Sequence, residues 1–392
     1  MAALWTVLCK ELLENLRDRR TLFSALIFGP LLGPLLFGAM VSRIVAQNAA
    51  NADRPITLTV VHGDRAPNLM HYLAAAGVKV RPATLSASGA RRAIDKGDAK
   101  VVLLVPRDYA ARFTAGTPAR IELMADSADN TTRDVAARAH ALLAAYGSAI
   151  AQLRLQARGV DPLLALPVAV DAIDVATPAG RAIAVIGFMT YFVLFALLMG
   201  GLYLAIDASA GERERGSLEA LLTLPVPRAA LVGGKILATS VYMCISLAIT
   251  LSAFVGIFRL LPLARLGMSA DVGWTTALAF FAICLPFVPL GAALMTFVAS
   301  FTRSYREAQS YLAAVLLVPT LPIAFASIYS LKPNVYLMLI PSLSQHLLMT
   351  SLLEGRPVAA IDVLLSAGAS LALAAALFLW TQRQWRNESM LG

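Results

Sequence analysis

The sequence is poor in charge, and this scarcity decides its class. Only 15% of the 392 residues are charged, 58% are hydrophobic, and the mean hydropathy is +0.70. Such a chain cannot cover its surface with polar groups, which excludes a soluble protein, and it is too long for a single anchor. We therefore expect a protein that crosses the membrane several times. The net charge of +9 then indicates loops that face anionic lipid rather than nucleic acid.

Paired cysteines and catalytic motifs are also absent. Cys9, Cys244 and Cys284 lie in or beside apolar segments without paired spacing, so neither a disulfide framework nor a zinc site is indicated. There is no HExxH motif and no GxxxxGK[ST] phosphate loop, because Gly234-Lys235 is followed by Ile236 instead of a magnesium-binding hydroxyl residue. We expect no catalytic residue, no metal site, no cofactor on this chain, and no ATP hydrolysis by it.

Apolar runs of about 20 residues, the length of a helix that crosses ~30 Å of hydrocarbon, recur along the chain. Residues 1–20 precede the first run and alternate apolar and charged residues at helical spacing, which predicts an amphipathic helix along the membrane surface. Prolines 286 and 289 in one run, and 319 and 322 in another, predict two kinked or broken helices. The six predicted spans are 21–41, 181–206, 230–258, 274–301, 311–330 and 360–381.

Residues 42–180 have a different character, with short apolar runs and more charge. Strand-like runs alternate with helical patterns, which predicts a water-soluble α/β domain inserted between the first and second spans. The predicted strands are 56–61, 101–105 and 121–124, and the predicted helices are 67–76, 88–96 and 132–156. The fold class is therefore a membrane α-helical protein with about six transmembrane helices and a large extracytoplasmic α/β domain.

Residues 331–358 are too polar for an easy span, because Pro341 is followed by Ser342, Ser344, Gln345 and His346. We interpret this stretch as a re-entrant or interfacial segment on the outer side.

Basic residues in the short loops predict the orientation. The loops on one side hold Lys10, Arg17, Arg19, Arg20, Arg213, Arg215, Arg228, Arg303, Arg306, Arg383 and Arg386, whereas the other side holds Arg259, Arg265, Lys332 and Arg356. The asymmetry places the N-terminus and the tail, 382–392, in the cytoplasm, and the 42–180 domain outside.

The loop at 207–229 is the most informative segment. Four charged residues, Glu212 to Arg215, precede an apolar ridge of Leu218, Leu221 and Leu222, and Arg215 and Glu219 have the i, i+4 spacing of an ion pair. Pro225 and Pro227 end the short helix. Two interpretations remain open: a solvated linker at the headgroups, or a docking helix that transmits force from a cytoplasmic motor to the spans on either side.

The GERERGSLEALLTLPVPR segment at 211–228, followed by Gly234-Lys235, resembles the coupling-helix region of ABC-2-type (type V) exporter permeases. Within that group the chain is similar to the NatB-like sodium-efflux permease family, mainly through AIDASAGERERGSLEALL and the preceding DVATPAGRA at 174–182. The order of parts agrees: a first span, a large insertion, and a five-span block with the charged loop between its first two helices.

The resemblance implies the membrane subunit of an ATP-driven exporter, with sodium efflux as its activity. It implies a homodimer in the bacterial inner membrane, bound to two copies of a separate NatA-like ABC ATPase that holds ATP and magnesium. The second cytoplasmic loop, 302–310, would make a lesser contact with the ATPase. The coupling residues that it implies are Glu212, Arg213, Glu214, Arg215, Gly216, Ser217, Leu218, Glu219, Leu222 and Pro225, with Arg303 and Arg306 in the second loop.

Hydroxyl groups in the spans are the candidate substrate ligands, because a hard cation prefers oxygen. Hydroxyls in spanning helices also commonly bond their own backbone, which is the alternative reading. Since the span centres carry no charge, an amphiphilic substrate suits the pathway as well, and export of a drug, peptide or lipid-like amphiphile is the alternative function. The candidate pathway residues are Thr190, Tyr191, Ser240, Tyr242, Ser246 and Thr250.

Two other classes compete with an ABC exporter. An ATPase-independent carrier is expected to show internal repeats, and the sequence has none that we recognise. A membrane-anchored sensor needs a cytoplasmic output domain, and only residues 382–392 follow the last predicted span. The carrier remains the weaker alternative because the chain has proline-broken helices.

Overall fold

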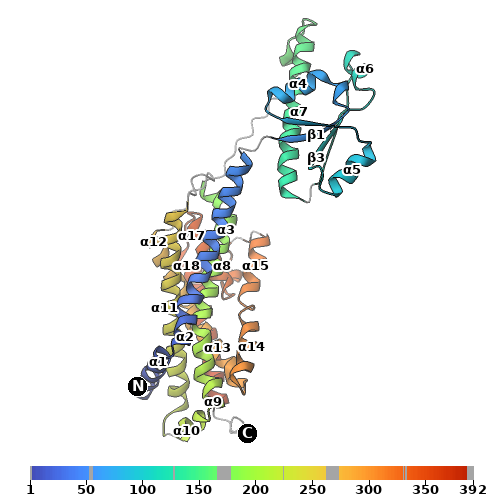
Figure 1. Cartoon of the computed structure of the whole chain (residues 1–392). Coiled ribbons are helices and arrows are strands. Elements are labelled where there is room, and N and C mark those ends of the chain that lie inside the picture. Colours follow the sequence, from blue (N-terminus) through green and yellow to red (C-terminus); the bar gives the residue numbers. More distant parts are fainter. Residues whose placement is uncertain are drawn as a thin grey trace. The chain divides into compact units, whose positions relative to one another are not determined.

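The computed structural model describes residues 2–52, 56–126, 129–165, 178–223, 225–261, 273–329, 331 and 333–385. They form two compact units, one of Met1–Gln47 with Val175–Gly392 and the other of Asn48–Asp174 (Figure 1). The end of the predicted 42–180 domain at 166–177, and residues 386–392 of the predicted tail, lie outside the described residues.

All secondary structure in the described residues of the first unit is helical. Its N-terminal part contains α1 (Ala2–Arg17), α2 (Arg19–Phe23), the π-helical turn η1 (Ser24–Phe28) and α3 (Gly29–Ala52). Its larger part contains α8 (Pro178–Ile206), the π-helical turn η4 (Asp207–Gly211), α9 (Glu212–Glu214), α10 (Ser217–Thr223), α11 (Arg228–Leu260), α12 (Trp274–Cys284), α13 (Phe287–Phe301), α14 (Tyr305–Val315), α15 (Thr320–Tyr329), α16 (Val335–Met338), α17 (Leu343–Leu353) and α18 (Ala360–Gln384).

By length and composition, five helices among the described residues can cross a membrane, or six if the bent pair α12 and α13 forms one span. The pair bends by 48° where Leu285 and Pro286 separate the two helices, which confirms the break predicted from the prolines. The long runs at 24–47, 187–214, 228–260, 305–326 and 360–384 supply the other candidates. A membrane α-helical architecture follows from these lengths.

The polar segment after α15 folds into two short helices, α16 and α17. With 11 residues, α17 is about 16 Å long, too short to cross a bilayer. It nevertheless lies in the interior, against α8, α12 and α18. Its entry residue Ser342 has a positive φ of 70°, and the Ser342 hydroxyl donates to the Pro319 carbonyl (2.7 Å) at the break between α14 and α15. The interior therefore holds non-spanning backbone whose polar groups are bonded within the protein.

Small residues allow α8 and α11 to pack closely, and these two helices form the most extensive contact in the unit. A Cβ atom on Gly200 would lie 2.3 Å from the Cβ of Ser246, and one on Gly201 would lie 2.7 Å from Met243. The Ser246 hydroxyl donates to the Ala196 carbonyl across the same contact (2.9 Å). Close packing and a side-chain hydrogen bond are the interactions that join helices in lipid.

We predict that Gly200→Ala destabilises the helical unit by about 1–3 kcal/mol, because the added methyl group forces α8 away from α11. The matched control is Gly187→Ala on the same helix, where a Cβ meets nothing within 4 Å. Thermal unfolding in detergent should give a lower Tm for Gly200→Ala and an unchanged or higher one for Gly187→Ala. Equal melting temperatures for the two variants would contradict the packing argument.

The second unit is an α/β domain with one four-stranded sheet, in the order β2-β1-β3-β4. Its strands β1, β2 and β3 are parallel, and β4 is antiparallel to β3. The strands are β1 (Thr57–Val61), β2 (Lys79–Ala83), β3 (Val101–Leu104) and β4 (Glu122–Ala125), and the helices are α4 (Pro67–Ala75), α5 (Ala87–Asp95), α6 (Tyr109–Thr114) and α7 (Asn130–Gln156), with the short turns η2 (Gly63–Arg65) and η3 (Pro162–Ala165).

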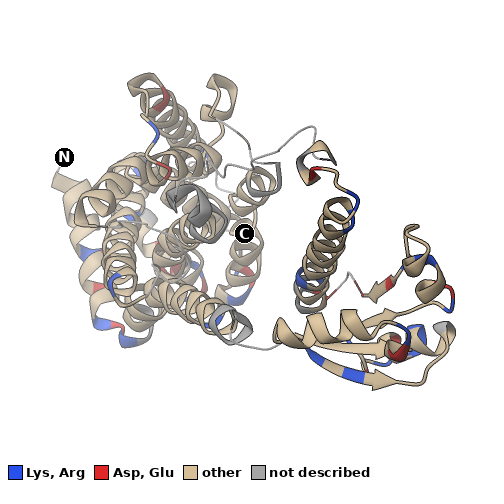
Figure 2. Cartoon of the chain, turned by 90° about the horizontal axis from the view of Figure 1, so that it is seen from above, with Lys and Arg blue, Asp and Glu red and all other residues tan. Residues whose placement is uncertain are grey.

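Three of the strands confirm the runs predicted at 56–61, 101–105 and 121–124, whereas β2 was missed. Its five residues, Lys-Val-Arg-Pro-Ala, include two charged residues and Pro82. Because β2 is an edge strand, the missing N–H of proline is tolerated there. Charged residues are spread over the helices and strands of this unit (Figure 2), and its own core contains Leu58, Leu69 and Leu103. Within that core, burial and the neighbouring Tyr146 raise the pKa of Tyr109 to about 12.

Candidate functional site

The loop that follows α8 is built as a direct extension of that helix. The π-helical turn η4 and then α9 continue α8 without a break, so Gly187–Glu214 form one 28-residue helix. It ends at Gly216, whose φ of +70° only glycine adopts freely. The chain then enters α10, and Pro227 starts α11. We refer to residues 212–223 as the α9–α10 loop. Because it is continuous with α8, a movement of the loop is passed to that helix.

Leu218 anchors α10 to the helical unit. Its side chain is buried in the main core, and Leu221 packs against the same core. The Ser217 hydroxyl donates to the Glu212 carbonyl (3.1 Å), which holds the start of α10 against α9. Leu222 lies in α10 as predicted, and Gly216, Ser217, Glu219 and Pro225 are exposed. The loop is therefore a fixed element with one exposed face.

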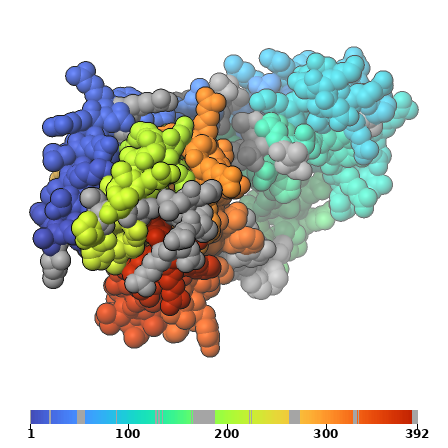
Figure 3. All heavy atoms as spheres, turned by 90° about the horizontal axis from the view of Figure 1, so that it is seen from below, coloured from blue at the N-terminus to red at the C-terminus, as the bar shows by residue number. Residues whose placement is uncertain are grey.

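The second predicted loop lies beside the first. The Arg213 guanidinium donates to the Thr302 carbonyl (2.9 Å), and the Tyr305 backbone N–H donates to the Glu214 carboxylate (2.7 Å). Seen from below, α9 and α10 (yellow-green) reach the surface between α1 (blue) and the start of α14 (orange) (Figure 3). Arg303 and Arg306 are exposed at this same end. The structure thus brings the two sequence-predicted segments, 212–223 and 302–306, together.

Arg215 does not pair with Glu219, although the i, i+4 spacing of the two residues predicts that pair. Its guanidinium instead binds the Asp207 carboxylate at 2.9 Å, and this hydrogen bond raises the pKa of Arg215. The physical reason is Gly216, which stands between the two residues and ends the helix on which an i, i+4 pair depends. Glu219 remains exposed on α10.

Glu212 also differs from expectation, because its side chain points into the protein. It is only 3% exposed and belongs to a cluster with Lys10, Glu11 and Glu14 of α1 and Lys235 of α11. The Lys235 ammonium lies 2.6 Å from the Glu212 carboxylate and 2.8 Å from that of Glu11. Lys10 hydrogen-bonds Glu212 as well and lies 3.2 Å from both Glu11 and Glu14. Sequence spacing gave no signal for this cluster, since its members lie up to 225 positions apart, from Lys10 to Lys235.

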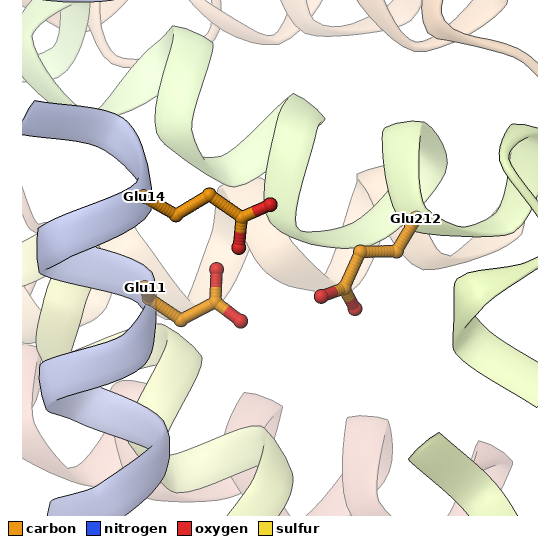
Figure 4. Close-up of side chains that lie close together, drawn as sticks. All are labelled: Glu11, Glu14 and Glu212. Carbon is orange, nitrogen blue, oxygen red and sulfur yellow. The ribbon is translucent and has the colours of Figure 1, made fainter. Parts of the chain in front are cut away.

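Three carboxylates of this cluster, Glu11, Glu14 and Glu212, point toward one another (Figure 4), and their oxygens lie within 4.8 Å. That spacing suits a metal ion, but the Lys10 and Lys235 ammonium groups already bind these carboxylates. Burial by itself would lower the pKa of Lys10, yet the hydrogen bond to Glu212 and the charges of Glu11 and Glu212 outweigh it and raise that pKa. The cluster is therefore an ion-pair network that links α1, α9 and α11.

The hydroxyl residues predicted to line a pathway mostly bond backbone carbonyls. Ser240 donates to Ile236 (2.8 Å), Thr250 donates to Ser246 (2.8 Å), and Ser246 joins α11 to α8. Tyr191 stacks on Phe195, and the buried Tyr242 hydroxyl has no partner in the described part of the chain. These contacts favour the structural reading for Ser240, Ser246 and Thr250.

Thr190 is the exception, because it meets a residue that the pathway prediction did not include. Its hydroxyl lies 2.6 Å from Nδ1 of His346 and donates to the Gly187 carbonyl at 2.8 Å. When the Thr190 hydroxyl gives its one proton to the Gly187 carbonyl, it accepts from His346 in the tautomer that carries the proton on Nδ1. Both side chains are buried, and they join α8 to α17. The signal in the sequence was the polar run at 342–346 inside an apolar region.

Comparison with known proteins agrees with this architecture. Residues 19–381 match the family described as ABC-2 family transporter protein. The ABC transporter permease protein NatB of Bacillus subtilis is 26% identical over 377 residues, which cover 94% of each chain. The family match at 19–381 includes the α/β unit, the α9–α10 loop and the candidate spans, the last of them up to residue 381. The chain therefore belongs to the ABC-2 family of transporter proteins, as a multi-pass membrane permease subunit.

Proposed function

We propose that this chain is the transmembrane subunit of an ATP-driven exporter and that a separate ABC ATPase docks on the α9–α10 loop. One observation carries the proposal: the loop is continuous with α8, is fixed to the core by Leu218, and leaves Glu214 and Glu219 exposed. A rigid, exposed, charged element at the end of a spanning helix can pass force from a motor to that helix. Arg303 and Arg306 of the second loop form the lesser contact.

The assembly that we propose has two copies of this chain and two ATPase subunits in the inner membrane. The ATPase holds ATP and magnesium, because this sequence has no phosphate loop. The excess of basic residues in the loops at 1–20, 207–229 and 302–310 supports a cytoplasmic position for this end of the helical unit. The α/β unit, inserted after the first span, then lies outside.

Sodium ions are the first proposed substrate, on the strength of the family resemblance. An amphiphile such as a drug, peptide or lipid-like molecule is the second, and a specific observation favours it. The hydroxyls of Ser240, Ser246 and Thr250 donate to backbone carbonyls, as hydroxyls with a structural role in spanning helices do, and the centres of the predicted spans carry no charge that would attract a cation.

ATP hydrolysis by the co-purified permease and ATPase in lipid nanodiscs tests both substrates. Saturable stimulation by sodium, not matched by potassium at equal ionic strength, is the expected result for cation efflux. Stimulation by amphiphiles alone would assign the second substrate class. Failure of the two subunits to associate would overturn the exporter proposal itself.

A further inference from the structure

Lys235 is a fully buried cation that serves no catalytic motif. Its side chain is 0% exposed, and it lies in the first turns of α11 next to Gly234. The two carboxylates that neutralise it come from different elements, Glu11 from α1 and Glu212 from α9. Glu11 and Glu212 are themselves 2% and 3% exposed. Three segments distant in the sequence therefore meet at one ammonium group.

The packing of α1 is arranged around this contact. Its buried face consists of Leu8, Glu11 and Asn15, whereas the apolar residues Trp5 and Leu13 are 65% and 58% exposed. The exposed apolar residues of α1 suit a helix at the membrane surface, where they meet lipid. The side of α1 that faces the bundle carries Glu11, whose carboxylate meets Lys235, so the ion pair joins this side of α1 to α11.

The glycine next to Lys235 completes the arrangement. A Cβ on Gly234 would lie 2.6 Å from Val7, and 3.2 Å from the Leu4 carbonyl, so only glycine allows α1 to approach α11 at this height. Gly233 likewise faces Leu4. The Gly-Gly-Lys sequence thus has a structural explanation: the glycines admit α1, and the lysine fixes it.

Buried ion pairs of this kind contribute little net stability, because desolvation offsets most of the attraction. Their removal on one side is costly, since the remaining charge is left buried without a partner. What such a pair provides is a fixed geometry among the elements that carry it. Here the fixed geometry joins the N-terminal helix to the loop at the end of α8.

We propose that Lys235 is a positioning residue that clamps α1 to the α9–α10 loop, so that the N-terminal helix and the loop move as one body. A displacement of α9 then reaches α11 and α1 through Glu212, Lys235 and Glu11, in addition to reaching α8 through the continuous backbone. The clamp itself follows from the contacts within this chain, and only its role in transport rests on the proposed function.

Hydrogen exchange of the purified chain in nanodiscs, without any ATPase, tests the clamp. In Lys235→Met the two carboxylates lose their buried cation, and exchange at the backbone amides of α1 is expected to rise by about tenfold or more, with little change in α14. The matched control is Arg17→Met, an exposed cation of the same helix outside the cluster, which should change α1 exchange by less than about threefold. Unchanged α1 exchange in Lys235→Met would overturn the proposal.

Glu11→Gln keeps the test decisive if Lys235→Met fails to fold. This variant keeps the shape of the side chain and the Lys235–Glu212 pair, so α1 exchange should rise while the α9–α10 loop stays protected. A residue with a merely structural role would loosen both segments together, and that result would contradict a clamp.

The role of Lys235 in transport is tested separately from the exchange experiment. With the ATPase present, Lys235→Met is expected to retain complex formation and ATP hydrolysis while losing most substrate transport, because the exposed Glu214 and Glu219 are unchanged. Transport at the wild-type level by a folded Lys235→Met complex would remove the clamp from the mechanism. If the wild-type chain binds no ATPase, the proposed function fails, whereas the exchange experiment still decides whether the clamp exists.

Discussion

Reversing the charges of Glu214 and Glu219 together, to lysine, is expected to weaken binding of the ATPase by about 100-fold or more. Both carboxylates are exposed on the α9–α10 loop, so the double variant presents two reversed charges to the ATPase; it also removes the contact of Glu214 with the Tyr305 backbone N–H, which the single Glu219 variant keeps. Affinity measured between purified permease and ATPase, with size-exclusion chromatography to verify folding, gives the comparison. Like charges brought together at an interface oppose association more strongly than the loss of one contact.

Two control variants show whether a loss of affinity comes from the charges of this loop. Glu122→Lys makes the same change at an exposed position of the α/β unit and should leave ATPase binding unchanged. Glu219→Lys alone leaves the contact between Glu214 and the Tyr305 backbone intact and should reduce affinity by about tenfold. Unchanged affinity of a folded double variant would remove the docking role of the loop.

Glu212 is left out of this variant for a structural reason. Its clustering with Glu214 predicts a surface contact, but its carboxylate is buried against Lys235. Reversing Glu212 would disrupt the ion-pair cluster and confuse a loss of docking with a loss of internal structure.

Gln345→Leu is expected to lower the free energy of unfolding by about 2 kcal/mol or more. The Gln345 amide is fully buried and bonds four groups: its oxygen accepts from the Ser342 backbone (2.7 Å) and the Ser344 hydroxyl (3.2 Å), and its nitrogen donates to Ser366 (3.0 Å) and Ser370 (3.1 Å). Leucine has a similar size but leaves this set without its central partner. The positive φ of Ser342 depends on the same capping contact.

Unfolding in mixed micelles, titrated with denaturing detergent, measures this effect. Ser370→Ala is the matched control because it removes only one of the four hydrogen bonds, and such a bond between membrane helices contributes about 0.6 kcal/mol on average. Equal stabilities of Gln345→Leu and Ser370→Ala would show that the network is not cooperative and that α17 is held by apolar packing alone.

Hydropathy and spacing along the chain were sufficient for the elements that depend on local sequence. The spans follow from apolar length, the bend between α12 and α13 follows from Pro286, and three strands of the α/β unit follow from β-branched runs. Strand β2 was not predicted because its five residues include two charged residues and Pro82, which an edge strand tolerates. The α9–α10 loop was recognisable from its charges, its leucines and the two prolines that follow.

The sequence did not predict which partners the charged residues bind. Spacing paired Arg215 with Glu219, and only the left-handed turn at Gly216 redirects Arg215 to Asp207. The amphipathic pattern of residues 1–20 predicts an apolar face and a charged face, but not that Glu11 and Asn15 would turn inward while Trp5 remains exposed. Neither His346 nor Lys235 could be matched to its partner, because Thr190 and Glu11 lie on other helices.

The sequence by itself determined that this chain is a multi-pass membrane protein with an inserted α/β unit and a charged loop after α8, because those properties are set by the composition of contiguous segments. Only the tertiary structure decided which charges are buried, which hydroxyls are hydrogen-bonded to backbone carbonyls, and that α1, the α9–α10 loop and α11 meet at Lys235. The physical reason is that the burial of a charged or polar group depends on partners brought from distant parts of the chain, and these partners are fixed by the packing of whole helices rather than by local spacing.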